Sequence, residues 1–92
     1  MSVLVVIEIP GGTSDLDDAL VEAWHLTGQP PPGNRLRMSG PMARGWRVVS
    51  LWDSPQQFDA FLQDRLHLTL SDLGDDLPTV IMWEIEKVHS FD

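Results

Sequence analysis

The stretch GWRVVSLWDSPQQFDAF, residues 45–61, contains a strand, a stop and the beginning of a helix. Its first half is rich in β-branched and aromatic residues, which favours a strand. Ser54 then offers an N-cap and Gln57 completes a capping box. Pro55 suits the first helical position, because its missing N–H would have no helical partner there in any case. A strand therefore runs almost directly into a helix, and Trp52 lies at the junction.

The residues before this stretch predict a strand, a helix and a second strand. VLVVIEI, residues 3–9, is apolar and β-branched, and the breaker PGGTS follows it. Ser14 can then serve as the N-cap of a helix that ends at Gly28. The apolar stripe of this helix consists of Leu16, Ala19, Leu20, Ala23, Trp24 and Thr27. After the loop QPPPGN, residues 35–42 predict a strand that forms a hairpin with residues 45–52.

The residues after the stretch predict a long helix and a last strand. The helix begins at the Ser54 cap and continues to Gly74. Its apolar stripe consists of Phe58, Phe61, Leu62, Leu66, Leu70 and Leu73. DDLP then predicts a loop, and residues 79–88 predict a strand.

The order strand, helix, strand, strand, helix, strand predicts a ferredoxin-like α+β fold that forms a single domain over residues 1–92. In this fold two helices cover one face of a four-stranded antiparallel sheet. A sheet with one wet face should alternate apolar and polar residues, yet 3–7 and 80–83 are apolar throughout. Both faces are therefore expected to be buried. A second copy of the chain can cover the face that the helices leave bare, which predicts a homodimer with a dimeric α/β barrel.

Composition narrows the function classes. The chain has 92 residues and a net charge of −8, which repels phosphate backbones and anionic lipids, so neither nucleic acid nor membrane is an expected partner. It has no cysteine, and no histidine pair has metal-ligand spacing, so neither a disulfide nor a metal site is expected. MSVLVVIEIP lacks the basic and small-residue parts of a signal peptide. We expect a cytoplasmic protein without a cofactor.

Four of the six basic residues are arginines in a segment without acids, namely Arg35, Arg37, Arg44 and Arg47. One interpretation is that they lie along solvated strand edges, where they discourage edge pairing. The other is that they form a small pocket for an anion or carboxylate.

The stretch RVVSLWDSPQQFDAFLQDRL resembles the antibiotic-biosynthesis-monooxygenase type of dimeric α/β-barrel protein. The resemblance covers the whole chain in length and element order, and in residues it covers about Val48 to Leu66. It implies a ferredoxin-like protomer, a barrel dimer and a pocket between helices and sheet in each protomer. Some members of the family oxidise aromatic polyketides without a cofactor, and others degrade haem.

The haem-degrading members use an Asn in the first strand, and a Trp and a His on the second helix. Aligned without gaps from Trp52, the Trp position falls on Phe61 and the His position near Ser71. The first strand, SVLVVIEI, has no Asn. The resemblance therefore does not extend to haem degradation, and it leaves a cofactor-independent monooxygenase-like activity as the enzymatic alternative.

The aromatic residues around the junction are candidates for packing or for a ligand site. Trp52 shares a strand face with Trp46, Val48 and Ser50, and we expect it to pack against the second helix through Phe58 and Phe61. The same rings, with Trp24 of the first helix, would line a pocket for a flat apolar ligand.

Three polar residues are candidates for binding or catalysis. Arg65 falls within the apolar stripe of the second helix, where its side chain either snorkels to water or faces a ligand carboxylate or phenolate. Glu84 lies in a strand expected to be buried, where it either pairs with an arginine across the dimer or acts as a general base. His67 lies opposite the stripe and would reach the pocket only if the helix kinked after Arg65.

Two functions remain open at this point. The first is a dimeric protein that binds a flat, apolar and in some cases anionic small aromatic molecule between helices and sheet. The second is a non-catalytic dimeric module for assembly, whose interior is filled by its own side chains. An open cavity of roughly 300 Å³ or more would favour the first.

Overall fold

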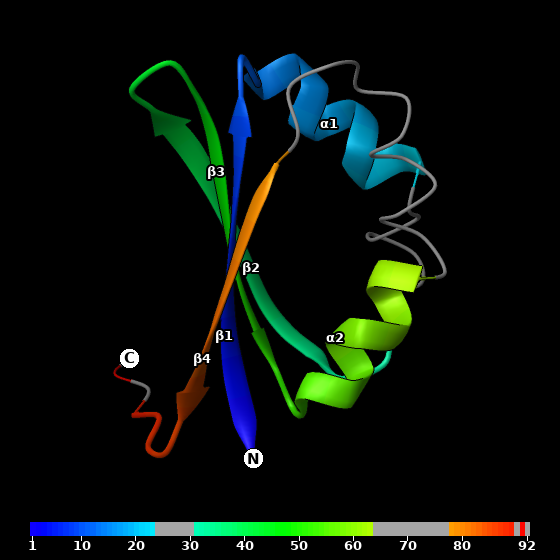
Figure 1. The fold of residues 1–92 in the computed structure, drawn as a ribbon, viewed down its shortest axis with the longest axis vertical. Helices are drawn as coiled ribbons and strands as arrows, with labels where there is room; N and C mark the ends of the chain where they lie inside the picture. The colour runs from blue at the N-terminus through cyan, green and yellow to red at the C-terminus, as the bar shows by residue number, and fades with distance from the viewer. Residues whose placement is uncertain (24–30, 64–77, 90, 92) are drawn as a thin grey trace.

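A computed structural model describes residues 1–23, 31–63, 78–89 and 91. The described elements are β1 (Ser2–Pro10), α1 (Ser14–Ala23), β2 (Asn34–Met42), β3 (Gly45–Trp52), α2 (Pro55–Phe61) and β4 (Thr79–Ile85). The strands form one antiparallel sheet in the order β2-β3-β1-β4. Both helices lie on one side of this sheet, which Figure 1 shows edge-on. The predicted ferredoxin-like α+β fold is confirmed.

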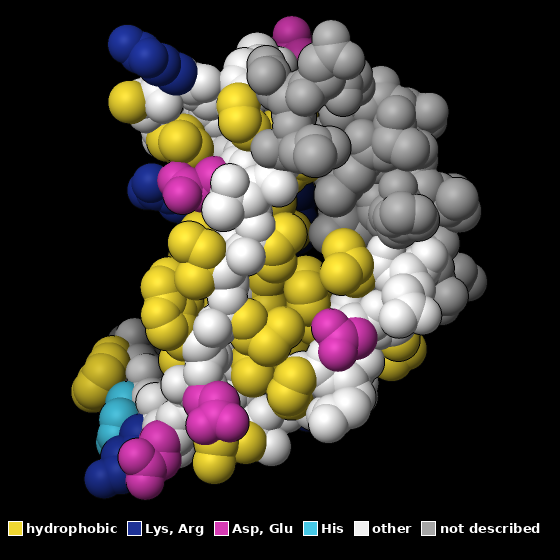
Figure 2. Space-filling view, viewed as in Figure 1, with side chains coloured by type: hydrophobic (Ala, Val, Ile, Leu, Met, Phe, Trp, Pro, Cys, Tyr) yellow, Lys and Arg dark blue, Asp and Glu magenta, His cyan; other side chains and the backbone are white. Residues whose placement is uncertain are grey.

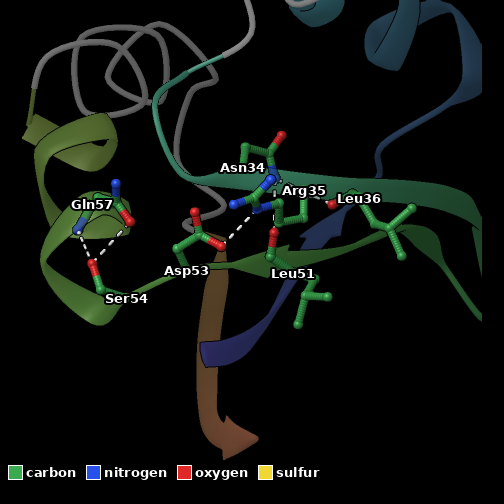
Figure 3. Close-up of polar contacts among 7 residues, drawn as sticks. All are labelled: Asn34, Arg35, Leu36, Leu51, Asp53, Ser54 and Gln57. Carbon is green, nitrogen blue, oxygen red and sulfur yellow. Dashed lines mark hydrogen bonds and ion pairs between the residues drawn. The ribbon is translucent and has the colours of Figure 1, made fainter. Parts of the chain in front are cut away.

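The helix beginnings follow the capping signals, with one shift. Ser54 caps α2 by accepting from the Gln57 backbone N–H at 3.3 Å, and its hydroxyl donates to Gln57 Oε1 at 3.0 Å (Figure 3). The cap of α1 is Thr13 rather than the expected Ser14, because Thr13 Oγ1 accepts from the Leu16 N–H at 3.1 Å. Ser14 is instead the first helical residue.

The β2–β3 hairpin turns through two residues, Ala43 and Arg44. Arg44, the second central residue of the turn, has a φ of 66°, in the left-handed region that few non-glycine residues adopt. Next to the turn, the sheet leaves no room for a side chain at Gly45. A Cβ there would lie 2.4 Å from the Ile9 carbonyl oxygen. Glycine at this position therefore allows β3 to approach β1 closely.

The hydrophobic core lies between the sheet and the two helices. β1 contributes every second residue to it, and the aromatic rings of α2 pack on top. The buried core residues are Val3, Val5, Ile7, Ile9, Leu20, Val48, Trp52, Phe58 and Phe61. Figure 2 shows hydrophobic side chains in this layer and also on the opposite side of the sheet.

The opposite side of the sheet carries apolar residues that no described helix covers, and we call it the open face. Two rows of paired residues cross all four strands there. One row is Leu36, Leu51, Leu4 and Trp83, and the next is Met38, Val49, Val6 and Ile81. Leu36, Met38 and Trp83 are at least half exposed, at 54%, 57% and 50%.

The last strand differs from its sequence prediction in two ways. β4 ends at Ile85 rather than Val88, and Glu86 forms a bend. Val80 to Trp83 are exposed in the single chain, although burial on both faces was expected. The reason is position in the sheet. Among the described strands β4 is an edge strand and pairs with β1 alone, whereas α1 and α2 contact β2 and β3.

Candidate functional site

A cavity lies between the sheet and the helices, and we call it the helix-side cavity. Its volume is about 20 Å³, which is room for about one water molecule. Small-molecule sites begin at roughly 300 Å³, so the protein's own side chains fill most of this space. Most of the wall is apolar, from Ile7, Ile9, Leu20, Pro31, Val48, Trp52, Phe58 and Phe61.

Trp52 is the centre of the aromatic side of the cavity. It is 2% exposed, and its ring centroid lies 5.4 Å from that of Phe58 and 5.3 Å from that of Phe61. The Phe58 ring meets it edge-on, which is a favourable aromatic geometry. The prediction that Trp52 packs against the second helix is confirmed, and its role toward a ligand stays a prediction.

The polar side of the cavity comes from three residues, Asn34, Arg37 and Ser50. Ser50 is buried, and its Oγ accepts a hydrogen bond from Trp52 Nε1 at 2.9 Å. Arg37 is the residue paired with Ser50 across the hairpin, so the two side chains share one face of the sheet. Asn34 uses its amide N–H groups to bond the Leu36 and Leu51 carbonyls at 3.2 and 3.3 Å (Figure 3).

An ion pair joins α1 to the sheet next to this cavity. Arg37 donates from Nη2 to Asp17 Oδ1 at 2.6 Å and from Nη1 to Oδ2 at 3.3 Å, and the Ser39 hydroxyl donates to Oδ2 at 3.0 Å. Both charged side chains are mostly buried, because that of Asp17 is 9% exposed and that of Arg37 is 18% exposed. Asp17 thus faces the sheet and joins α1 to β2.

The environment of Asp17 lowers its pKa. Burial alone would raise the pKa of this carboxyl, but the hydrogen bonds and charge of Arg37, helped by Ser39, outweigh burial. The buried Trp46 indole N–H also helps lower the pKa of Asp17, although no hydrogen bond of good geometry joins the two. The carboxylate form is therefore the stable one at neutral pH.

The arginine-rich segment does not form an anion pocket. Arg35 pairs with Asp53 at 2.7 Å (Figure 3), and Arg47 pairs with Glu8 across the open face at 2.8 Å. With Arg37 bound to Asp17, three of the four guanidinium groups already hold a carboxylate. The acids come from other parts of the chain, which is why the acid-free segment was misleading.

The predicted site residues are only partly brought together. Trp52, Phe58 and Phe61 meet in one cluster, whereas Glu84 is exposed on an edge strand. Trp24, Arg65 and His67 lie outside the described residues, so their roles stay predictions. The cavity-lining role of Ser50 was missed, although its spacing of two from Trp52 already placed both side chains on one strand face.

Two general features bear on the class of site. Within the described ranges, no group of three or more His, Cys, Asp and Glu side chains is arranged to hold a metal ion. None of the described helices combines the length and apolarity needed to cross a membrane.

Comparison with known proteins finds solved structures of the same fold but no match by sequence. No family model and no curated protein matches the sequence. Among solved structures, Rv0793 from Mycobacterium tuberculosis superposes with a TM-score of 0.73 and 16% identity, over 98% of this chain and 100% of that one. A candidate antibiotic biosynthesis monooxygenase from Deinococcus radiodurans has a TM-score of 0.61 and 13% identity, over 100% and 99% of the two chains.

A third similar structure is the heme-degrader MhuD (Rv3592) from Mycobacterium tuberculosis, with two hemes bound in its active site. It has a TM-score of 0.60 and 16% identity, over 98% of this chain and 100% of that chain. Identities this low establish a shared fold and no shared activity. The resemblance to the antibiotic-biosynthesis-monooxygenase type is therefore confirmed at the level of the fold.

Proposed function

For a chain with this fold, we propose a homodimeric α/β barrel in which each protomer binds a flat, apolar small molecule between helices and sheet. The observation that carries the proposal is the open face, where eight apolar residues form two rows across four strands. No described carboxylate or histidine lines the helix-side cavity, so the proposal assigns binding and no reaction.

The open face supports the dimer because its apolar rows are continuous. Exposed apolar patches of this kind mark interaction surfaces. The face also carries two shallow hollows of about 290 and 280 Å³, the first beside Leu4 and Leu36 and the second beside Arg47 and Val49. A second copy offers the same rows, so a two-fold contact pairs apolar with apolar surface.

Analytical ultracentrifugation tests the dimer directly. We expect the protein to sediment as a dimer at micromolar concentration. A stable monomer at this concentration would remove the dimer from the proposal.

The ligand half of the proposal rests on the lining of the helix-side cavity. Apolar and aromatic walls with a few polar groups are typical of small-molecule sites. Isothermal titration with 2-naphthoate, a flat anionic probe, tests this half and also the sequence prediction for Arg65. We expect wild-type protein to bind 2-naphthoate, and Arg65→Ala to lose binding while remaining dimeric. Unchanged affinity in Arg65→Ala would remove Arg65 as the anion-binding group.

A second candidate function is assembly alone, and the cavity volume of about 20 Å³ favours it. In that case the aromatic cluster serves only as core. The two functions differ in one measurement, because an assembly module would sediment as a dimer and bind no flat aromatic probe, charged or neutral.

A further inference from the structure

The Ser50 hydroxyl has a proton that no described group accepts. A serine hydroxyl donates one hydrogen bond and can accept two. The Trp52 indole N–H occupies one acceptor position of Ser50 Oγ at 2.9 Å. Across the described part of the chain, the Ser50 side chain makes no other hydrogen bond. Its own proton is therefore available to another group.

The surroundings of Ser50 direct that proton toward the helix-side cavity. Ser50 is 6% exposed and lines the cavity, and Trp52, which is 2% exposed, fixes the oxygen from one side. Leaving a buried donor unpaired costs free energy, because the hydrogen bond that it made with water is lost on folding. The cavity volume of about 20 Å³ admits one oxygen-sized group beside the hydroxyl, so the rest of a ligand has to displace side chains that line the cavity.

The charge next to Ser50 is already balanced. Arg37 lies beside Ser50 on the same face of the sheet, but both terminal nitrogens of Arg37 already donate to the Asp17 carboxylate. A ligand carboxylate at Ser50 would have to compete with Asp17 for this guanidinium and would lie near a second negative charge. A neutral acceptor oxygen meets neither obstacle.

We infer that Ser50 is the ligand-recognition residue of the cavity and donates a hydrogen bond to a carbonyl-type oxygen of a flat, uncharged molecule. Trp52 is a positioning residue, because its N–H holds the Ser50 oxygen so that the proton points to the ligand. This inference rests on the ligand half of the proposed function, and it adds the chemical class of the ligand.

A matched pair of probes tests the inference on the wild-type protein. Acetophenone carries a carbonyl, and α-methylstyrene has a CH₂ group in place of the oxygen with nearly the same shape. In a titration followed by the indole N–H signals in NMR spectra, we expect acetophenone to bind about fivefold more tightly or better, the worth of one hydrogen bond. The infrared carbonyl band of bound acetophenone should lie below its position in hydrocarbon solvent.

Two serine variants separate the hydroxyl from its surroundings. Ser50→Ala should remove the preference for acetophenone and return the carbonyl band to its position in hydrocarbon solvent, whereas Ser50→Thr, which keeps a hydroxyl, should retain both. Ser39→Ala is the control, because Ser39 lies on the same face of the sheet as Ser50 but bonds Asp17 and does not line the cavity. It should behave like wild type toward both probes.

The outcomes distinguish this inference from the proposed function. Equal binding of the two probes, with an unshifted carbonyl band, would overturn the role of Ser50 while leaving a ligand site. Binding of neither neutral probe would overturn the inference, and if 2-naphthoate also failed to bind, the ligand half of the proposed function would fall with it and assembly alone would be favoured. Because the infrared and selectivity measurements on wild-type protein need no variant, the inference stays testable even if Ser50→Ala fails to fold.

Discussion

The two faces of the sheet have similar apolar content and opposite surroundings. On the helix side, Val3, Val5 and Ile7 of β1 are nearly inaccessible under the two helices. On the open face, Leu36, Met38 and Trp83 are at least half exposed in the single chain. The comparison teaches that apolar residues on both faces of a strand indicate that both faces have to be shielded from water. The two helices shield one face of this sheet and leave the other exposed in the single chain.

The two faces also hold their charges differently. The Asp17–Arg37 pair on the helix side is mostly buried and has a third partner in Ser39. The Glu8–Arg47 pair on the open face is more exposed, at 26% and 49%. Ion pairs in water contribute little to stability, whereas removing one partner of a buried pair leaves an unpaired charge. Breaking the ion pair on the helix side is therefore expected to lower the stability more than breaking the pair on the open face.

The largest expected effect is on the helix side. Phe58→Ala removes a ring that is 1% exposed and contacts Trp52, so it should lower the free energy of unfolding by about 3–5 kcal/mol. Urea denaturation followed by tryptophan fluorescence measures this loss. A loss below about 1 kcal/mol would show that α2 is not held by its aromatic residues.

The next largest effect is expected on the open face, where a substitution should weaken the dimer and leave the core intact. Met38→Asp places a charge among the apolar rows, so the dimer should dissociate at least tenfold more readily. The circular dichroism spectrum should stay that of a folded chain. Asp59→Ala, at an exposed position on α2, is the control and should leave the sedimentation coefficient unchanged. Dimerisation that survives Met38→Asp would place the interface elsewhere.

The third effect concerns the buried ion pair, whose contribution to stability depends on pH. Because the folded-state pKa of Asp17 lies below its usual value of 3.8, its contribution to stability is present above that pH and is lost as the pH falls through the lower folded value. Asp17→Asn should cost about 1–3 kcal/mol at pH 7, the worth of hydrogen bonds to a charged group. Urea midpoints measured between pH 5 and pH 2.5 should fall less steeply in the variant than in wild type.

The smallest effect is expected for the exposed ion pair. Arg47→Ala should change the free energy of unfolding of the monomeric Met38→Asp background by less than about 1 kcal/mol, and salt should reduce the difference. The measurement is a pair of urea denaturation curves at low and high salt. A loss as large as that of Asp17→Asn would mean that the two faces do not differ in the way that their exposure indicates.

Local signals accounted for the parts of the structure that depend on neighbours in the chain. The Ser54 cap and the apolar runs predicted an element order that the structure confirms for the described residues, whereas the helix ends predicted at Gly28 and Gly74 lie outside those residues. Within the described residues, the predicted elements differ from the observed ones at their ends, such as Thr13 in place of Ser14 as cap and Ile85 in place of Val88 as the last residue of β4. These ends depend on single hydrogen bonds, which several adjacent residues can make.

The candidate site was predictable only in its aromatic half. The spacing of Trp52, Phe58 and Phe61 across a strand–helix junction is a local pattern, and the three rings do meet. The polar half joins residues far apart in sequence. Arg37 meets Asp17 only because β2 lies under α1, and no local pattern contains this contact.

The sequence by itself determined the order of the elements, the aromatic contact between β3 and α2, and the apolar character of both faces of the sheet. Only the tertiary structure decided which face the helices cover, which carboxylate each arginine binds, and how little space remains beside Ser50. The reason is physical, because capping and periodicity act within a few residues, whereas burial and charge pairing depend on which distant segments the fold brings together.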